Sequence, residues 1–145
     1  MSYEAEAAVA LEALALAGGA RGKRYRFARN GEGPMIIDPR PLLEELARDL
    51  LGGVDAPDIA ASFHRAVADM VVETATELCS RHGTSDVVIS GGVFQNRLLC
   101  ELILARAEAA PWRLFMHRLV PPNDGGVSLG LSLIHISEPT RLRRI

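Results

Sequence analysis

Residues 86–96 read DVVISGGVFQN, and this stretch decides the fold class of the chain. Its first half is a run of strand length that is apolar in the middle and leads directly into Gly91-Gly92. A helical pattern follows, which the spacing predicts to begin near Phe94 or Gln95 and to continue to about Ala109. A strand, a glycine pair and a helix in this order are typical of an α/β fold.

The residues after this unit repeat the same order of elements. Pro111 ends the helical pattern, residues 112–117 have the composition of a second strand, and residues 120–126 read VPPNDGG, a loop. A helix of small residues is predicted to begin at Gly126 or Val127. The second half is therefore predicted to be α/β, with parallel strands because a helix connects them. If the strands are neighbours, both loops open on the same edge of the sheet and could bracket one ligand.

The first half of the chain is predicted to be mainly helical. Apolar residues recur at helical spacing in three stretches, each followed by glycine: residues 3–17, 42–51 and 57–82. Between the first two, residues 24–28 and 35–37 have strand patterns, and Asn30-Gly31 supplies a turn, so we expect a β-hairpin. The basic and aromatic residues at 21–26 are interpreted as a solvated strand face.

Composition and charge limit the classes of protein to which the chain can belong. Its 145 residues are 48% hydrophobic and 23% charged, which is ordinary for one globular domain. The formal net charge of −2 gives no broad basic surface, so we expect no nucleic-acid partner. The acidic start of the chain has no apolar run long enough for a membrane, so we expect a cytoplasmic protein without membrane contact. Cys79 and Cys100 lack zinc-type spacing, which predicts reduced, buried thiols.

The last fourteen residues differ in character from the rest of the chain. Residues 134–141 read IHISEPTR and continue no helical stripe. They resemble translated adapter sequence of the kind found at the ends of assembled reads. We therefore divide the chain into a folded region, residues 1–131, and a tail, residues 132–145, that we expect to be non-native.

The first glycine pair can serve a ligand in two ways. Gly91 and Gly92 let the backbone approach a ligand closely, and the amino terminus of the following helix would offer free N–H groups to a phosphate. Asn96, expected one turn into that helix, could hydrogen-bond a nucleotide base or ribose. The alternative is that the two glycines only make a tight turn between strand and helix.

The second glycine loop adds a carboxylate. Asp124 stands before Gly125-Gly126, where it could ligate a metal ion that bridges phosphates. The alternative is that Asp124 caps the helix that begins at Gly126. His117 precedes this loop by seven residues, and a role in the site stays open. His64 is interpreted as a packing residue of its long helix.

Four segments of the chain carry a more specific signal: ISGGVFQNRLL at 89–99, VPPNDGG at 120–126, SYEAEAAVALEALA at 2–15 and AASFHR at 60–65. Together they resemble the carboxyl-terminal region of the HypF family of hydrogenase-maturation carbamoyltransferases. The third segment is similar to the family's Tyr-Glu-Gly-Gln-Ala-Ala helix, and the fourth to its Phe-His helix. Each is modest alone, but four in this order over about residues 2–131 are specific.

The resemblance implies a fold and an activity. The fold is the second lobe of an actin-like ATPase, here truncated, similar to the threonylcarbamoyl-transfer enzymes of tRNA modification, with nucleotide and metal between two lobes. The family uses carbamoyl phosphate and ATP to form a carbamoyl-adenylate. It passes the carbamoyl group to the carboxyl-terminal cysteine of its partner HypE, and dehydration there gives the cyanide ligand of nickel–iron hydrogenase.

The resemblance also implies roles for particular residues. Gly91, Gly92 and Asn96 match the nucleotide-contacting loop of the family, with Gly125 on the second loop placed beside them. Asp124 matches its carboxylate metal ligand. The sequence assigns no catalytic residue.

Departures from the family pattern limit what this chain can do alone. Ala5 stands where the family has glycine, and its methyl group could crowd a backbone approach to the ribose; Glu6 replaces the usual glutamine. The family's histidine pair, which supplies the other metal ligands, and its acylphosphatase, zinc-finger and carbamoyl-adenylate-forming domains lie upstream. We therefore expect no turnover by this chain alone. The alternatives are a lobe of a tRNA threonylcarbamoyl transferase or other actin-like ATPase, or an inactive partner-binding fragment.

Overall fold

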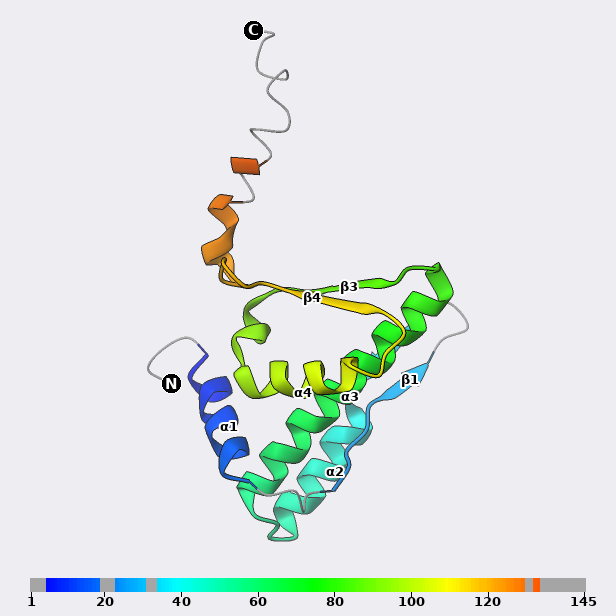
Figure 1. Cartoon of the computed structure of the whole chain (residues 1–145). Coiled ribbons are helices and arrows are strands. Elements are labelled where there is room, and N and C mark those ends of the chain that lie inside the picture. Colours follow the sequence, from blue (N-terminus) through cyan, green and yellow to red (C-terminus); the bar gives the residue numbers. More distant parts are fainter. Residues whose placement is uncertain (1–4, 19–22, 31–33, 130–131, 134–145) are drawn as a thin grey trace, which may run out of the picture.

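The computed structural model describes residues 5–18, 23–30, 34–129 and 132–133 (Figure 1). The expected non-native tail lies outside these residues except for Ser132 and Leu133, which are helical, as are residues 127–129. The elements follow one another in this order: helix α1 Glu6–Ala17, strands β1 Ala28–Asn30 and β2 Ile36–Asp38, helices α2 Arg40–Leu51 and α3 Ala56–His82, strand β3 Asp86–Ile89, the 3₁₀ turn η1 Gly92–Gln95, helix α4 Arg97–Ala107, strand β4 Arg113–Met116 and the 3₁₀ turn η2 Asp124–Gly126.

Helix α3 is the central element of the molecule, and α1, α2 and α4 all pack against it (Figure 1). The residues buried along it are mostly small, among them Ala60, Ala61, Ser62, Ala66 and Ala68. The separation of packed helices depends on the side chains at the contact, so small residues allow a close approach. At Gly18, directly after α1, an added Cβ would lie 2.3 Å from the carbonyl oxygen of Pro57. Gly18 is therefore required where α1 meets the start of α3.

The carboxyl ends predicted for α2 and α3 are confirmed, since Gly52 and Gly83 follow the two helices. Helix α2 begins after Pro39, and the Asp38 side chain accepts a 3.0 Å hydrogen bond from the Arg40 backbone N–H. Helix α3 ends before Gly83, whose φ of 64° lies in the left-handed region that glycine adopts without strain. The chain turns there and enters β3.

Strands β1 and β2 form the expected antiparallel hairpin, but the first strand begins later than predicted. It covers Ala28–Asn30 instead of residues 24–28. Asn30 pairs with Ile36 within the hairpin, so its predicted place in the turn is wrong, and Gly31 lies outside the described residues. Residues 23–27 form no regular element. Lys23 and Tyr25 contact Asp49 of α2, and Arg24 contacts Asp69 of α3.

Tyr25 is buried, so the interpretation of its segment as a solvated strand face is wrong for this residue, whereas Lys23, Arg24 and Arg26 beside it are exposed as expected. Only 2% of its surface is exposed. It packs in a hydrophobic cluster with Leu42, Ile59 and Ala66. Its hydroxyl donates a 2.9 Å hydrogen bond to the buried carboxylate of Asp49, which also pairs with Lys23. The Lys23 ammonium lowers the pKa of Asp49, whereas burial and then the Asp49 carboxylate raise the pKa of Tyr25 to about 12.

Replacing Tyr25 with phenylalanine is expected to lower the free energy of unfolding by about 2 kcal/mol at neutral pH, because a buried carboxylate loses a hydrogen bond. Folding raises the tyrosine pKa from 10.0 to about 12, so its contribution is complete below pH 10 and is lost as the pH rises toward 12. Urea unfolding of both proteins across this range measures the effect. A difference between them that stays constant above pH 10 would contradict the expectation.

Strands β3 and β4 form the parallel pair that the sequence predicted, with Ile89 opposite Met116 at the last position. One face of the pair packs through Leu114 on a cluster formed by α3 and α4. On the other face Val88 and Phe115 lie opposite each other and are exposed. Because the strands are parallel and in register, both following loops begin at one edge of the sheet.

Two expectations from composition can be compared with the structure. Cys79 and Cys100 are both buried and form no disulfide, as predicted. In the described part of the chain, none of the helices combines the length and the apolar character needed to cross a membrane.

Candidate functional site

The two glycine loops lie against each other at the carboxyl edge of the β3–β4 pair. We call residues 90–96 the first loop and residues 117–126 the second loop. The Gly91 N–H donates a 2.7 Å hydrogen bond to the carbonyl oxygen of Pro122. His117 Nε2 and Ser90 Oγ lie 2.9 Å apart, within hydrogen-bond distance. The prediction that both loops open on one edge is confirmed, and His117 belongs to their contact.

Gly91 is the residue of the first loop whose backbone requires glycine. Its φ is 107° and its ψ is 163°, a conformation that L-residues rarely adopt. Space is not the reason, because an added Cβ would meet nothing within 4 Å. This conformation directs the Gly91 N–H to Pro122 and leads the chain into η1.

Asn96 is the amino-terminal cap of α4 and does not lie one turn inside the helix, as the sequence had predicted. Helix α4 begins at Arg97, and η1 occupies the residues where the helix was expected to start. Asn96 has extended backbone angles, and its side-chain Oδ1 accepts a 2.7 Å hydrogen bond from the Leu99 N–H. The helix starts there because this side chain satisfies one of its free N–H groups.

The amino terminus of α4 is already partnered inside the chain. Besides the Leu99 N–H, the Leu98 N–H donates a 3.1 Å hydrogen bond to Glu12 Oε1 of α1. The expectation that this helix would offer free N–H groups to a phosphate is therefore wrong for these two groups. A carboxylate and an amide oxygen occupy the positions that a phosphate would need.

His64 joins the first loop to α3, which the sequence analysis did not foresee. It is 4% exposed; its Nδ1 donates a 2.8 Å hydrogen bond to the carbonyl oxygen of Ala60. Its Nε2 lies 2.9 Å from Nδ2 of Asn96. The available signal was the Phe-His pair at 63–64, which the family resemblance contained but which was interpreted as packing. Glu12 was also missed, and no feature of the sequence distinguished it from other helical glutamates.

A cavity of about 310 Å³ lies among α1, α3, η1 and α4. Its walls are mainly apolar, and its polar lining residues are Glu12, His64, Gln95 and Asn96. Small-molecule sites in proteins are of this kind, a largely apolar hollow with a few converging polar groups. Of the predicted nucleotide residues, Gly92 and Asn96 line the cavity, whereas Gly91 and Gly125 lie outside the lining.

Asp124 is exposed on the second loop and is not the helix cap that was the alternative for it. Asn123 is the cap of η2: its Oδ1 accepts a 3.1 Å hydrogen bond from the Gly125 N–H. The Asp124 carboxylate makes no hydrogen bond or ion pair with the described residues. No group of three His, Cys, Asp or Glu side chains in the described ranges could hold a metal ion. Asp124 therefore fits a hard divalent cation only as a single oxygen ligand from this chain.

Ala5, at the edge of the cavity, has a conformation that suits glycine. It precedes α1 with φ of 62° and ψ of 11°, and among the described residues it is the one non-glycine residue with positive φ. The left-handed conformation costs an L-residue about 1–2 kcal/mol. The resemblance had placed glycine at this position, and the backbone gives a physical reason for that preference.

Replacing Ala5 with glycine is expected to raise the free energy of unfolding by about 0.5–1 kcal/mol, the relief of strain less the added entropy of the unfolded chain. The matched control is Ala13→Gly, in the exposed interior of α1, which is expected to cost about 1 kcal/mol. Urea unfolding of the three proteins measures both values. Equal destabilisation by the two substitutions would show that Ala5 is not strained.

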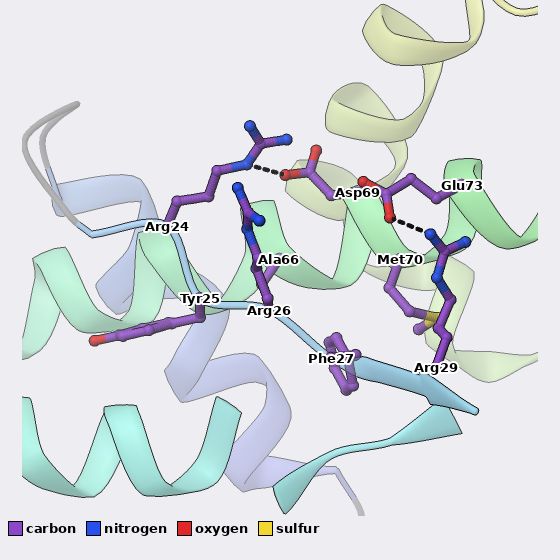
Figure 2. A pocket seen from close by; sticks show the side chains of 9 residues that line it. All are labelled: Arg24, Tyr25, Arg26, Phe27, Arg29, Ala66, Asp69, Met70 and Glu73. Carbon is purple, nitrogen blue, oxygen red and sulfur yellow. Dashed lines mark hydrogen bonds and ion pairs between the residues drawn. The ribbon is translucent and has the colours of Figure 1, made fainter. Parts of the chain in front are cut away.

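A second hollow, of about 590 Å³, lies between residues 24–29 and α3 (Figure 2). Arg24 and Arg26 extend to the side on which Asp69 lies, away from the ring of Tyr25. Arg24 Nε lies 3.3 Å from Asp69, and Arg29 lies 3.2 Å from Glu73. These carboxylates offset much of the positive charge of the arginines. The hollow is therefore lined by ion pairs, and we do not assign it as an anion-binding site.

The chain was compared with known proteins and matches, over residues 1–131, the family described as "Carbamoyltransferase, Kae1-like Domain, second subdomain". A carbamoyltransferase HypF homolog from Cupriavidus necator is 32% identical over 145 residues, covering 94% of this chain and 36% of the relative. A tRNA N6-adenosine threonylcarbamoyltransferase from Prochlorococcus marinus is 31% identical over 81 residues, covering 56% of this chain and 23% of that relative.

Among solved structures, that of full-length HypF in its phosphate- and nucleotide-bound form superposes with a TM-score of 0.85 at 29% identity, covering 98% of this chain and 18% of that one. The α/β fold is thus a truncated lobe of the actin-like type, as predicted. The chain spans only 17% to 36% of the length of the first curated carbamoyltransferases it matches.

Proposed function

The chain belongs to the carbamoyltransferase family, as the second subdomain of its Kae1-like domain, and from that premise we propose that it is the nucleotide-binding lobe of a larger enzyme. That enzyme takes carbamoyl phosphate and ATP and carbamoylates the carboxyl-terminal cysteine of HypE, the step that leads to the cyanide ligand of nickel–iron hydrogenase. The observation that carries the proposal is the 2.7 Å hydrogen bond from Gly91 to Pro122, which joins the two glycine loops beside the cavity.

Different residues of the described part of the chain bind different parts of ATP. The apolar walls of the cavity suit a nucleobase, and Asn96 and Gly92 in its lining contact the nucleoside. The hydrogen bond of Gly91 with Pro122 keeps the two loops close, and Gly91 and Gly125, which have no side chains, let the backbone approach the phosphates. Asp124, exposed and without a partner in the described part of the chain, supplies one oxygen to a divalent cation. Such a cation, when bound, offsets phosphate charge.

The proposal is tested first by titrating ATP with Mg²⁺ into the 145-residue chain by calorimetry. Gly91→Ala forces an L-residue into a conformation that favours glycine, which costs about 1–3 kcal/mol, and should weaken binding about tenfold or more. The control is Gly83→Ala, at the far end of α3, where φ is also positive and an added Cβ also meets nothing within 4 Å. If both variants bind ATP like the wild type, the first loop is a structural turn.

The reaction itself requires the longer enzyme. Given ATP, carbamoyl phosphate and HypE, the 145-residue chain alone should yield no carbamoylated cysteine, because it supplies one lobe and one carboxylate of the site. The longer protein should yield it, as measured by the mass of HypE. Carbamoyl transfer by the chain alone would contradict the proposal that the rest of the site lies in the longer enzyme.

A further inference from the structure

We infer that His64 is a positioning residue: as a neutral imidazole it accepts from the side-chain amide of Asn96 and holds that amide in the orientation that the Leu99 N–H sets, so that Asn96 offers a ligand one amide hydrogen. This inference rests on the proposed function, because the ligand concerned is the one that occupies the cavity. It assigns His64 no contact with the reacting atoms.

The orientation of the Asn96 amide follows from its backbone neighbour. The Leu99 N–H can only donate, so the Asn96 atom 2.7 Å from it must be the oxygen. The amide nitrogen therefore faces His64, 2.9 Å from Nε2. This assignment uses the chemistry of the donors and needs no hydrogen position to be known.

The protonation state of His64 follows in turn. An amide nitrogen has no acceptor to offer, so His64 Nε2 must carry a lone pair and accept from it. Nδ1 lies 2.8 Å from the Ala60 carbonyl oxygen, which only accepts, so Nδ1 carries the proton. Both nitrogens of the buried ring are satisfied only in the neutral Nδ1-protonated tautomer, and an imidazole has no other atom that forms hydrogen bonds.

This arrangement determines what Asn96 can present. Its oxygen accepts from Leu99 and one amide hydrogen is donated to His64, which leaves a second amide hydrogen. Asn96 therefore offers the cavity a donor, matched to ligand acceptors such as a ring nitrogen or a sugar oxygen. Without His64 the amide keeps its bond to the Leu99 N–H but its nitrogen loses its fixed acceptor. A polar group that is already held in place costs less to bind than one that must be ordered.

The same contact ties the first loop to α3. The Asn96 N–H donates to Val93 of η1, and its carbonyl accepts from Cys100 of α4. His64 thus holds the residue at which η1 ends and α4 begins. The imidazole also packs edge to face with the ring of Phe63, its neighbour in α3, with the two centroids 6.0 Å apart and the planes at 86°.

The experiment compares His64→Leu, which removes both polar contacts, with His64→Gln, whose side-chain oxygen can accept at the position of Nε2. In the 145-residue chain, His64→Leu is expected to weaken ATP binding about tenfold, and His64→Gln to restore it to within about threefold of the wild type. His82→Leu, an exposed histidine at the end of α3, is the matched control and should bind ATP normally. Asn96→Ala should remove the effect of His64→Leu when the two are combined.

Nitrogen NMR of the His64 ring gives a readout independent of ATP, with Nδ1 expected protonated and Nε2 unprotonated. A protonated Nε2, a His64→Gln variant no better than His64→Leu, or additive effects in the double variant would each overturn the inference. If the wild-type chain binds no ATP, the proposed function fails instead. The ring tautomer and the coupling of His64 with Asn96, measured by urea unfolding, then decide whether His64 holds Asn96.

Discussion

On the proposed function, replacing Asp124 with alanine is expected to abolish ATP-dependent carbamoyl transfer by the longer enzyme. The loss should be about 100- to 1,000-fold or greater, the scale seen when one group that stabilises developing charge is removed. The reason lies in the position of Asp124, exposed on the second loop beside the contact of Gly91 with Pro122. The measurement is the rate of HypE carbamoylation followed by mass.

The Asp124→Ala substitution should leave the fold unchanged, so a loss of activity can be attributed to the chemistry of the site. Asp124 makes no hydrogen bond or ion pair with the described residues, so its removal should alter the free energy of unfolding by less than about 0.5 kcal/mol. Glu108→Ala is the control and should keep full activity, because Glu108 lies at the carboxyl end of α4, whereas the first loop adjoins its amino end. An active Asp124→Ala enzyme would mean that the second loop has a structural role only.

Leu42→Ala is expected to have the largest effect on stability, a loss of about 3 kcal/mol. Leu42 is 1% exposed and packs in the cluster of Tyr25, Ile59 and Ala66. Truncating a buried leucine loses transfer free energy and leaves a cavity, which together cost about 2–5 kcal/mol. A loss of this size is a large share of the total stability of a small domain. Urea unfolding of the 145-residue chain measures it.

Helix α2 itself supplies the control for this substitution. Leu51, at the last position of the helix, is 89% exposed, and Leu51→Ala should change stability by less than about 0.5 kcal/mol. Both substitutions remove the same atoms from the same helix. If the two variants were equally unstable, the burial of Leu42 in the core would not be what stabilises α2, because alanine forms helices at least as well as leucine.

The sequence predicted the part of the site that depends on local pattern and topology. The strand before Gly91 and the strand before the second loop had clear patterns, and a helix between two neighbouring strands is typical of a parallel pair. Parallel neighbours end at one edge, so the meeting of the two loops followed without knowledge of any side-chain contact. The family resemblance then supplied the chemistry.

The contacts that hold the site were beyond the sequence because they join residues far apart in it. His64 meets Asn96 across 32 positions, and Glu12 meets Leu98 across 86. The start of α4 was placed too early because the 3₁₀ turn η1 continues the apolar spacing of a helix over Val93 and Phe94. Only the side chain of Asn96, through its bond to Leu99, shows where the helix begins.

Tyr25 shows a different limit. A basic and aromatic alternation usually has one face in water, and nothing in the segment itself shows which face is covered. Asp49, which accepts the hydrogen bond of the Tyr25 hydroxyl, lies 24 residues away in α2. The apolar stripe of this helix did not indicate a buried carboxylate. A buried acid of this kind becomes visible only when the helices are packed.

The exposed face of the β3–β4 pair governs how the isolated chain behaves in concentrated solution. Parallel sheets are normally covered on both faces, whereas Val88 is 70% and Phe115 47% exposed here. Among the described residues, the ion pair of Asp86 with Arg113 lies on this surface, and the Arg113 guanidinium lies 5.7 Å from the centroid of the Phe115 ring. Salt screens such pairs, so added salt should promote self-association of the chain, and charged substitutions at Val88 offer a route to a soluble, well-behaved fragment.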